Sequence, residues 1–72
     1  MIKIEKTNTK LANKLKRLRV QKDKTQKQLA EIFDVSVSAI SSYEVGDRVP
    51  SDKIKAKYSA FFGKTVDEIF FN

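Results

Sequence analysis

Apolar residues recur at helical spacing in short blocks along the chain. Leu11, Leu15 and Leu18 are four and then three residues apart, which predicts a helix over residues 9–22 with one apolar face. Two further helices are predicted on either side of a break at residues 34–35, with apolar positions at Leu29, Ala30, Phe33, Val35, Ile40 and Tyr43. Two more follow, with apolar positions at Ile54, Tyr58, Phe61 and Phe62, and then at Val66, Ile69 and Phe70. The pattern therefore predicts five helices and a tight turn between the second and third.

Residues that start and stop helices stand at the expected boundaries. Thr25 with Gln28 has the pattern of a capping box, in which a hydroxyl and an amide satisfy free backbone N–H groups. Ser36 can cap the third helix, which Gly46 ends in a left-handed conformation. The other boundary residues are Ser51 after Pro50, Gly63, and a second capping box of Thr65 with Glu68. Asp23 and Asp34 stand where a left-handed residue is needed, a conformation that Asp tolerates.

The length and composition limit what the chain can be. Its 72 residues allow one small domain, which we expect over residues 9–72, after an arm at residues 1–8. The alternation of Ile2 and Ile4 with polar residues leaves two interpretations of this arm, a short strand or a frayed end. Cys and His are both absent, so the usual metal ligands, thiol nucleophiles and neutral-pH bases are missing. We therefore predict no catalysis, no metal and no cofactor.

The chain is basic, with a formal net charge of +6. Much of the excess lies between Lys10 and Lys27, where Asp23 is the only acidic residue. A basic surface attracts polyphosphate, although a solvated helix face would explain the same charges. The chain has no apolar run as long as the roughly 20 residues of a membrane span. The N-terminus lacks the apolar core of a signal peptide, and we expect a cytoplasmic protein.

Several features coincide between residues 26 and 51: Gln26, Ala30, Val35, Ile40, Glu44-x-Gly46 and Pro50-Ser51. Together they closely resemble the helix-turn-helix of the lambda-repressor-like, Cro-type (Xre) family of bacterial and phage regulators. The resemblance implies a compact all-α domain whose second and third helices form the helix-turn-helix. It also implies sequence-selective binding of double-stranded DNA.

The resemblance implies that the segment 36–45 lies in the major groove with its first turn toward the bases. Val37, Ser38 and Ser42 then become the candidate base-reading residues, with Ser41 on the flank. This surface lacks the Gln, Asn or Arg that makes paired hydrogen bonds to a base. We therefore expect much of the selectivity to come from DNA shape and bound water. The alternative is that these serines only face solvent.

The resemblance also assigns roles outside that segment. The family's matching glutamine touches the DNA backbone, which implies a phosphate contact for Gln26. Our further phosphate candidates are Arg48 in the following loop, Lys27 and Lys53. An arginine and a glutamate at the positions of Arg19 and Glu44 form a structural ion pair in the family. The competing role for Arg19 is that of another cation facing DNA.

Family members generally bind two half-sites as symmetric dimers, so we expect a homodimer on a palindromic operator. The aromatic-rich carboxyl end suggests a dimer contact through Val66, Ile69, Phe70 and Phe71, with core packing as the alternative. The predicted function is a transcription regulator, most often a repressor. An antitoxin-type or other protein-interaction module is the alternative. An RNA binder is a third, which the position of the aromatics disfavours because they lie away from the basic stripe.

Overall fold

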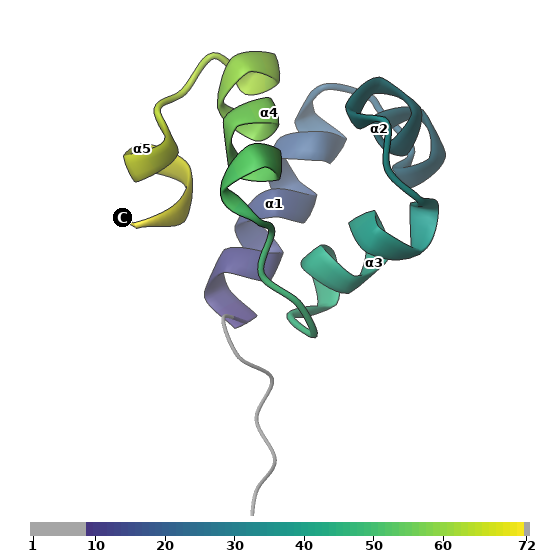
Figure 1. Ribbon diagram of the computed structural model, residues 1–72, viewed down its shortest axis with the longest axis horizontal. Coiled ribbons are helices and arrows are strands. Elements are labelled where there is room, and N and C mark those ends of the chain that lie inside the picture. The colour runs from purple at the N-terminus through teal and green to yellow at the C-terminus, as the bar shows by residue number, and fades with distance from the viewer. Residues whose placement is uncertain (1–8, 72) are drawn as a thin grey trace, which may run out of the picture.

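The computed structural model describes residues 9–71, which form helices joined by short turns (Figure 1). The helices are α1 (Thr9–Gln21), α2 (Gln26–Phe33), α3 (Val37–Val45), α4 (Asp52–Phe62) and α5 (Val66–Phe70). The all-α class and the predicted helices are therefore confirmed. The arm predicted at residues 1–8, with its two interpretations, lies outside the described residues. None of the helices between residues 9 and 71 is long and apolar enough to cross a membrane.

The predicted caps start the helices as the sequence indicated. The Thr25 hydroxyl accepts the Gln28 backbone N–H at 3.0 Å, and the Gln28 side chain accepts the Thr25 N–H at 2.8 Å. Thr65 and Glu68 form the same reciprocal pair at the start of α5. The Ser36 hydroxyl accepts the Ala39 N–H at 3.0 Å. These bonds satisfy N–H groups that have no partner within the helix, so each boundary is fixed locally.

Left-handed residues end α1, α2, α3 and α4. Asp23 and Asp34 have φ of 56° and 57°, and Gly46 and Gly63 have 85° and 67°. Asp34 makes the turn between α2 and α3, where the Val35 N–H donates to the Ala30 carbonyl at 3.0 Å. The chain therefore passes from α2 to α3 through residues 34–36 alone. The predicted left-handed conformations at the two aspartates are confirmed.

The core lies between α1 and the other helices. Helix α1 packs on both α3 and α5, while α2 packs on α3 and α4 on α5 (Figure 1). The fully buried large side chains come from every helix: Leu15, Leu29, Phe33, Ile40, Tyr58 and Ile69. The rings of Phe33 and Tyr58 meet edge to face with centroids 4.8 Å apart, which joins α2 to α4. The stripes predicted from spacing therefore meet in one core, with Leu11, Val35, Phe61 and Phe70 only partly buried at its edge.

The carboxyl end differs from the prediction in one respect. Ile69, expected in a dimer contact, is 1% exposed and belongs to the core of the single chain. Phe70 packs edge-on against Tyr58 with ring centroids 5.7 Å apart, whereas Phe71 is 67% exposed. The expectation is wrong for Ile69, because a side chain enclosed by its own chain offers no surface to another. Val66 and Phe70 are half-buried, so part of each side chain is exposed to solvent.

Candidate nucleic-acid interface

Helix α3 presents its first turn to solvent at the edge of the molecule (Figure 1). Val37 is 43% exposed and Ser38 is exposed, whereas Ser41 and Ser42 are half-buried. The opposite face of α3 is buried through Ala39, Ile40, Tyr43 and Glu44. The predicted base-reading residues therefore share an accessible surface, with Ser42 less accessible than Val37 and Ser38.

A buried ion pair fixes α3 to α1. The Arg19 Nε donates to Glu44 Oε2 at 2.8 Å, and Arg19 Nη2 donates to Glu44 Oε1 at 3.0 Å. A third Arg19 nitrogen, Nη1, donates to the Lys24 carbonyl at 2.6 Å. The side chains of Arg19 and Glu44 are only 11% and 1% exposed. Such a paired, two-point contact holds both charges and orients the last turn of α3.

Gln26 completes this network. Its side-chain amide donates to Glu44 Oε1 at 3.1 Å, so Glu44 on α3 binds both α1 and α2. The sequence did not indicate this contact, because the two residues are 18 positions apart. The amide predicted to contact phosphate is therefore committed to Glu44 in the free protein. The backbone at the start of α2 keeps the orientation that favours an anion.

The other predicted phosphate contacts are exposed cations. Lys27 lies in the first turn of α2, Arg48 in the turn after α3, and Lys53 in the first turn of α4. Within the described part of the chain, none of the three forms an ion pair. The Arg48 N–H donates to the Ser42 carbonyl at 3.3 Å, which fixes the backbone of this turn to the end of α3. Arg48 therefore extends from a backbone that is fixed beside the end of α3.

Groups of acidic side chains that could hold a metal ion are absent between residues 9 and 71. The candidate surface therefore offers hydroxyls, one apolar side chain, backbone N–H groups and cations. These groups suit a large polyanion. The cations can position it through its charges, and the short side chains can contact its individual groups.

Comparison with known proteins identifies the family to which the chain is similar. A helix-turn-helix family model matches residues 15–69. The HTH-type transcriptional activator BcrR of Enterococcus faecalis is 45% identical over 56 residues, which are 78% of this chain and 28% of that protein. The uncharacterized HTH-type transcriptional regulator MJ0272 of Methanocaldococcus jannaschii is 38% identical over 60 residues, which are 83% of this chain and 91% of that one. The chain thus spans less than a third of the first relative and most of the second.

Proposed function

From the premise that this chain belongs to the helix-turn-helix family of DNA-binding transcription regulators, we propose that it binds double-stranded DNA in a sequence-selective manner. The observation that carries the proposal is the exposure of Val37 and Ser38 in the first turn of α3, a helix that the buried Arg19–Glu44 pair fixes to α1 at its last turn. In the proposed complex, α3 lies in the major groove. Val37 contacts a thymine methyl group, and Ser38 and Ser42 exchange hydrogen bonds with base edges, with Ser41 on the flank.

The proposed selectivity depends on DNA shape as well as on direct contacts. A serine hydroxyl both donates and accepts, so it distinguishes bases less well than a paired contact, which is worth about 1–3 kcal/mol. The reading surface of α3 offers no side chain capable of such a pair. Sequence-dependent bending and groove width then supply the rest of the discrimination.

Lys27, Arg48 and Lys53 position the protein in this proposal by contacting phosphates on either side of the groove. Gln26 contributes through the start of α2, either with backbone N–H groups or by exchanging Glu44 for a phosphate oxygen. If the bound form neutralises about six to ten phosphates, affinity falls by about 10³ to 10⁵ between low and moderate salt. A binding constant that stays level over this salt range would contradict the proposal.

The base-reading surface can be tested by one triple variant. The variant carries Val37→Ala, Ser38→Ala and Ser42→Ala. It loses the proposed direct contacts, and the introduced alanines favour the helix. A duplex enriched from a random pool by the parent protein is compared with a scrambled duplex by fluorescence anisotropy. The parent should prefer the enriched duplex, and the triple variant should lose most of that preference. Val20→Ala, an exposed valine on α1, is the matched control. Equal preference in the parent and the triple variant would refute the assignment.

We further propose a homodimer that occupies a palindromic operator and represses by excluding polymerase. Two reading helices would then lie about 34 Å apart, one turn of DNA. Exposed Phe71 and the accessible parts of Phe70 and Val66 are the proposed contact. Because one relative is a transcriptional activator, repression by this protein has to be tested separately from dimer formation. Sedimentation of the parent and of Phe71→Ser, free and on the enriched duplex, tests the dimer. A parent that remains monomeric in both states would exclude it.

A further inference from the structure

Helix α5 has five residues and little more than one turn of backbone hydrogen bonds. The capping box at Thr65 secures its start. Within the helix, the Ile69 N–H donates to the Thr65 carbonyl at 3.1 Å, and the Phe71 N–H donates to the Asp67 carbonyl at 3.0 Å. A helix this short is marginal in water, so contacts with the rest of the chain have to stabilise it.

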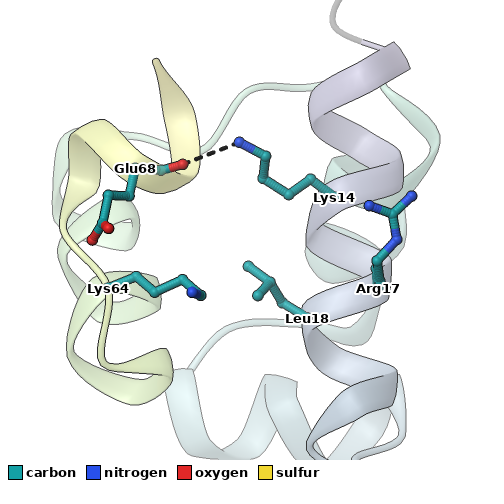
Figure 2. A pocket seen from close by; sticks show the side chains of 5 residues that line it. All are labelled: Lys14, Arg17, Leu18, Lys64 and Glu68. Atoms are coloured by element: carbon teal, nitrogen blue, oxygen red, sulfur yellow. Dashed lines mark hydrogen bonds between the residues drawn. The ribbon is translucent and has the colours of Figure 1, made fainter. Parts of the chain in front are cut away.

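A lysine of α1 supplies such a contact. The Lys14 Nζ donates to the carbonyls of Glu68 and Ile69 at 3.1 and 3.0 Å. Figure 2 shows the Lys14 side chain reaching from α1 to the backbone of α5 at Glu68. The last carbonyls of a helix lack partners within it, and the helix dipole favours a cation beside them. Lys14 therefore binds α5 at the end that the capping box does not secure.

The two carbonyls that Lys14 binds lie directly before a pair of aromatic residues. The Ile69 carbonyl belongs to the planar peptide group that leads into Phe70, so a hydrogen bond to it fixes the direction in which the chain continues. A second lysine, Lys55 of α4, has its Nζ 5.6 Å from the centre of the Phe70 ring and 5.0 Å from that of Phe71. Half-buried Phe70 and exposed Phe71 are thus oriented by a backbone contact from α1 and a ring contact from α4.

Given the homodimer proposed above, on which this inference rests, we propose that Lys14 is a positioning residue for the dimer contact. Lys14 acts through α5 and does not itself contact the second copy. It holds the end of α5 so that Phe70 and Phe71 meet the second copy in one conformation. A side chain oriented in advance loses less conformational entropy on association than a mobile one. Loss of the Lys14 ammonium therefore weakens the dimer, although every side chain of the contact is kept.

The rival role for Lys14 is a phosphate contact, because this residue belongs to the basic stretch between Lys10 and Lys27. Helix α1 packs on both α3 and α5, and these two helices lie on opposite sides of the molecule (Figure 1). The hydrogen bonds to α5 direct the Lys14 ammonium away from the helix proposed to contact DNA. The geometry therefore favours the positioning role.

The first measurement is amide hydrogen exchange of the full chain by NMR, in the parent, Lys14→Met and two controls. Lys16→Met removes the same charge from an exposed position of α1. Thr25→Ala removes the cap of α2 and so lowers the stability of the whole fold without touching α5. In Lys14→Met the amides of Ile69 and Phe71 should exchange at least about tenfold faster, because loss of hydrogen bonds from a charged donor lets α5 open more often.

In both controls these two amides should exchange within about twofold of the parent rate, because α5 opens locally. Unchanged exchange in Lys14→Met would overturn the proposal. Equal acceleration in Thr25→Ala would also overturn it, because α5 would then open only with the whole fold. Lys14→Arg keeps the charge and the N–H donors, so it should exchange more slowly than Lys14→Met.

The second measurement is the dimer dissociation constant from sedimentation, for the free proteins and on the enriched duplex. It should rise at least about tenfold in Lys14→Met and change by less than about twofold in Lys16→Met and Thr25→Ala. Equal dimer affinity in Lys14→Met and the parent would overturn the proposal. A dimeric parent with unchanged α5 exchange in Lys14→Met retains the dimer and rejects the role of Lys14. A monomeric parent with faster α5 exchange in that variant rejects the dimer and retains Lys14 as the residue that positions α5.

The third measurement separates the positioning role from the phosphate contact. The affinity of the parent and of Lys14→Met for a duplex with one half of the enriched site is measured from low to moderate salt. A positioning residue leaves the slope of log affinity against log salt unchanged on this half-site. A slope reduced by about 1 in Lys14→Met would assign Lys14 to a phosphate and overturn the proposal.

Discussion

Removing Arg19 tests the link between the core and the reading helix. Arg19→Ala deletes two hydrogen bonds to Glu44 and one to the Lys24 carbonyl. Among residues 9–71, the Glu44 carboxylate, 1% exposed, would keep only the Gln26 amide as a partner. Leaving one charge of a buried pair without its partner costs about 3–5 kcal/mol.

This loss is large for so small a domain. A chain of 72 residues is stable by roughly 4–11 kcal/mol, at 0.05–0.15 kcal/mol per residue. Each kcal/mol lowers the melting temperature of a domain of this size by about 4–8 °C. We therefore expect Arg19→Ala to melt at least about 12 °C below the parent.

The assay is thermal and urea unfolding followed by circular dichroism, with DNA affinity measured where both proteins remain folded. Arg17→Ala, two residues away and exposed, is the matched control and should change stability by less than about 0.5 kcal/mol. The double variant Arg19→Met/Glu44→Leu removes both charges and should recover most of the stability, because apolar replacement of a buried pair is often neutral.

One outcome would refute this reasoning. If Arg19→Ala melts within about 3 °C of the parent, the pair contributes less than 1 kcal/mol to the fold. Weaker DNA binding at that unchanged stability would then assign Arg19 to the DNA contact. A double variant less stable than Arg19→Ala would equally contradict the role of the uncompensated Glu44 charge.

Three further predictions concern single residues. The fully buried Tyr58 hydroxyl has no hydrogen-bond partner among the described residues, and burial raises the pKa of Tyr58. Tyr58→Phe should therefore raise the free energy of unfolding by about 1 kcal/mol in urea titrations, and a lower free energy of unfolding would contradict this reasoning. Asp34 is left-handed, so Asp34→Gly should gain up to about 1 kcal/mol, whereas Asp34→Ala should lose stability. The hydrogen bond from the Thr65 backbone N–H lowers the pKa of Glu68 in the folded state. The stability that the ionised Glu68 carboxylate contributes is therefore fully present above its unfolded-state pKa of about 4.3, and it is lost as the pH falls through the folded-state pKa. Glu68→Gln should thus make the melting temperature less dependent on pH in that acidic range, and an unchanged acid dependence would contradict this.

Local signals explain why so much of the fold was predictable. The capping boxes at Thr25 and Thr65 depend on residues three positions apart, and the structure contains both. The left-handed conformation of Asp34 follows from its place at the end of α2, where a short turn leads to the next helix. Such features are decided by neighbouring residues, so the sequence carries them directly.

The contacts that were not predictable join residues far apart in the chain. Gln26 was expected to contact DNA, but its amide binds Glu44, 18 residues later. Ile69 was expected at an interface, yet its burial depends on how α5 packs against α1 and α4. Lys14 reaches carbonyls of α5 that are 54 and 55 residues away. Helical spacing shows that a face is apolar but does not show which element covers it.

The three-helix link through Glu44 has a thermodynamic consequence. Arg19 and Gln26 already restrain α3 in the free protein. The helix proposed to contact DNA is therefore ordered before DNA binds. Association then loses little conformational entropy on the protein side. Calorimetry of the parent with its enriched duplex should accordingly give a heat-capacity change set by the contact area alone, without the additional term that accompanies coupled folding.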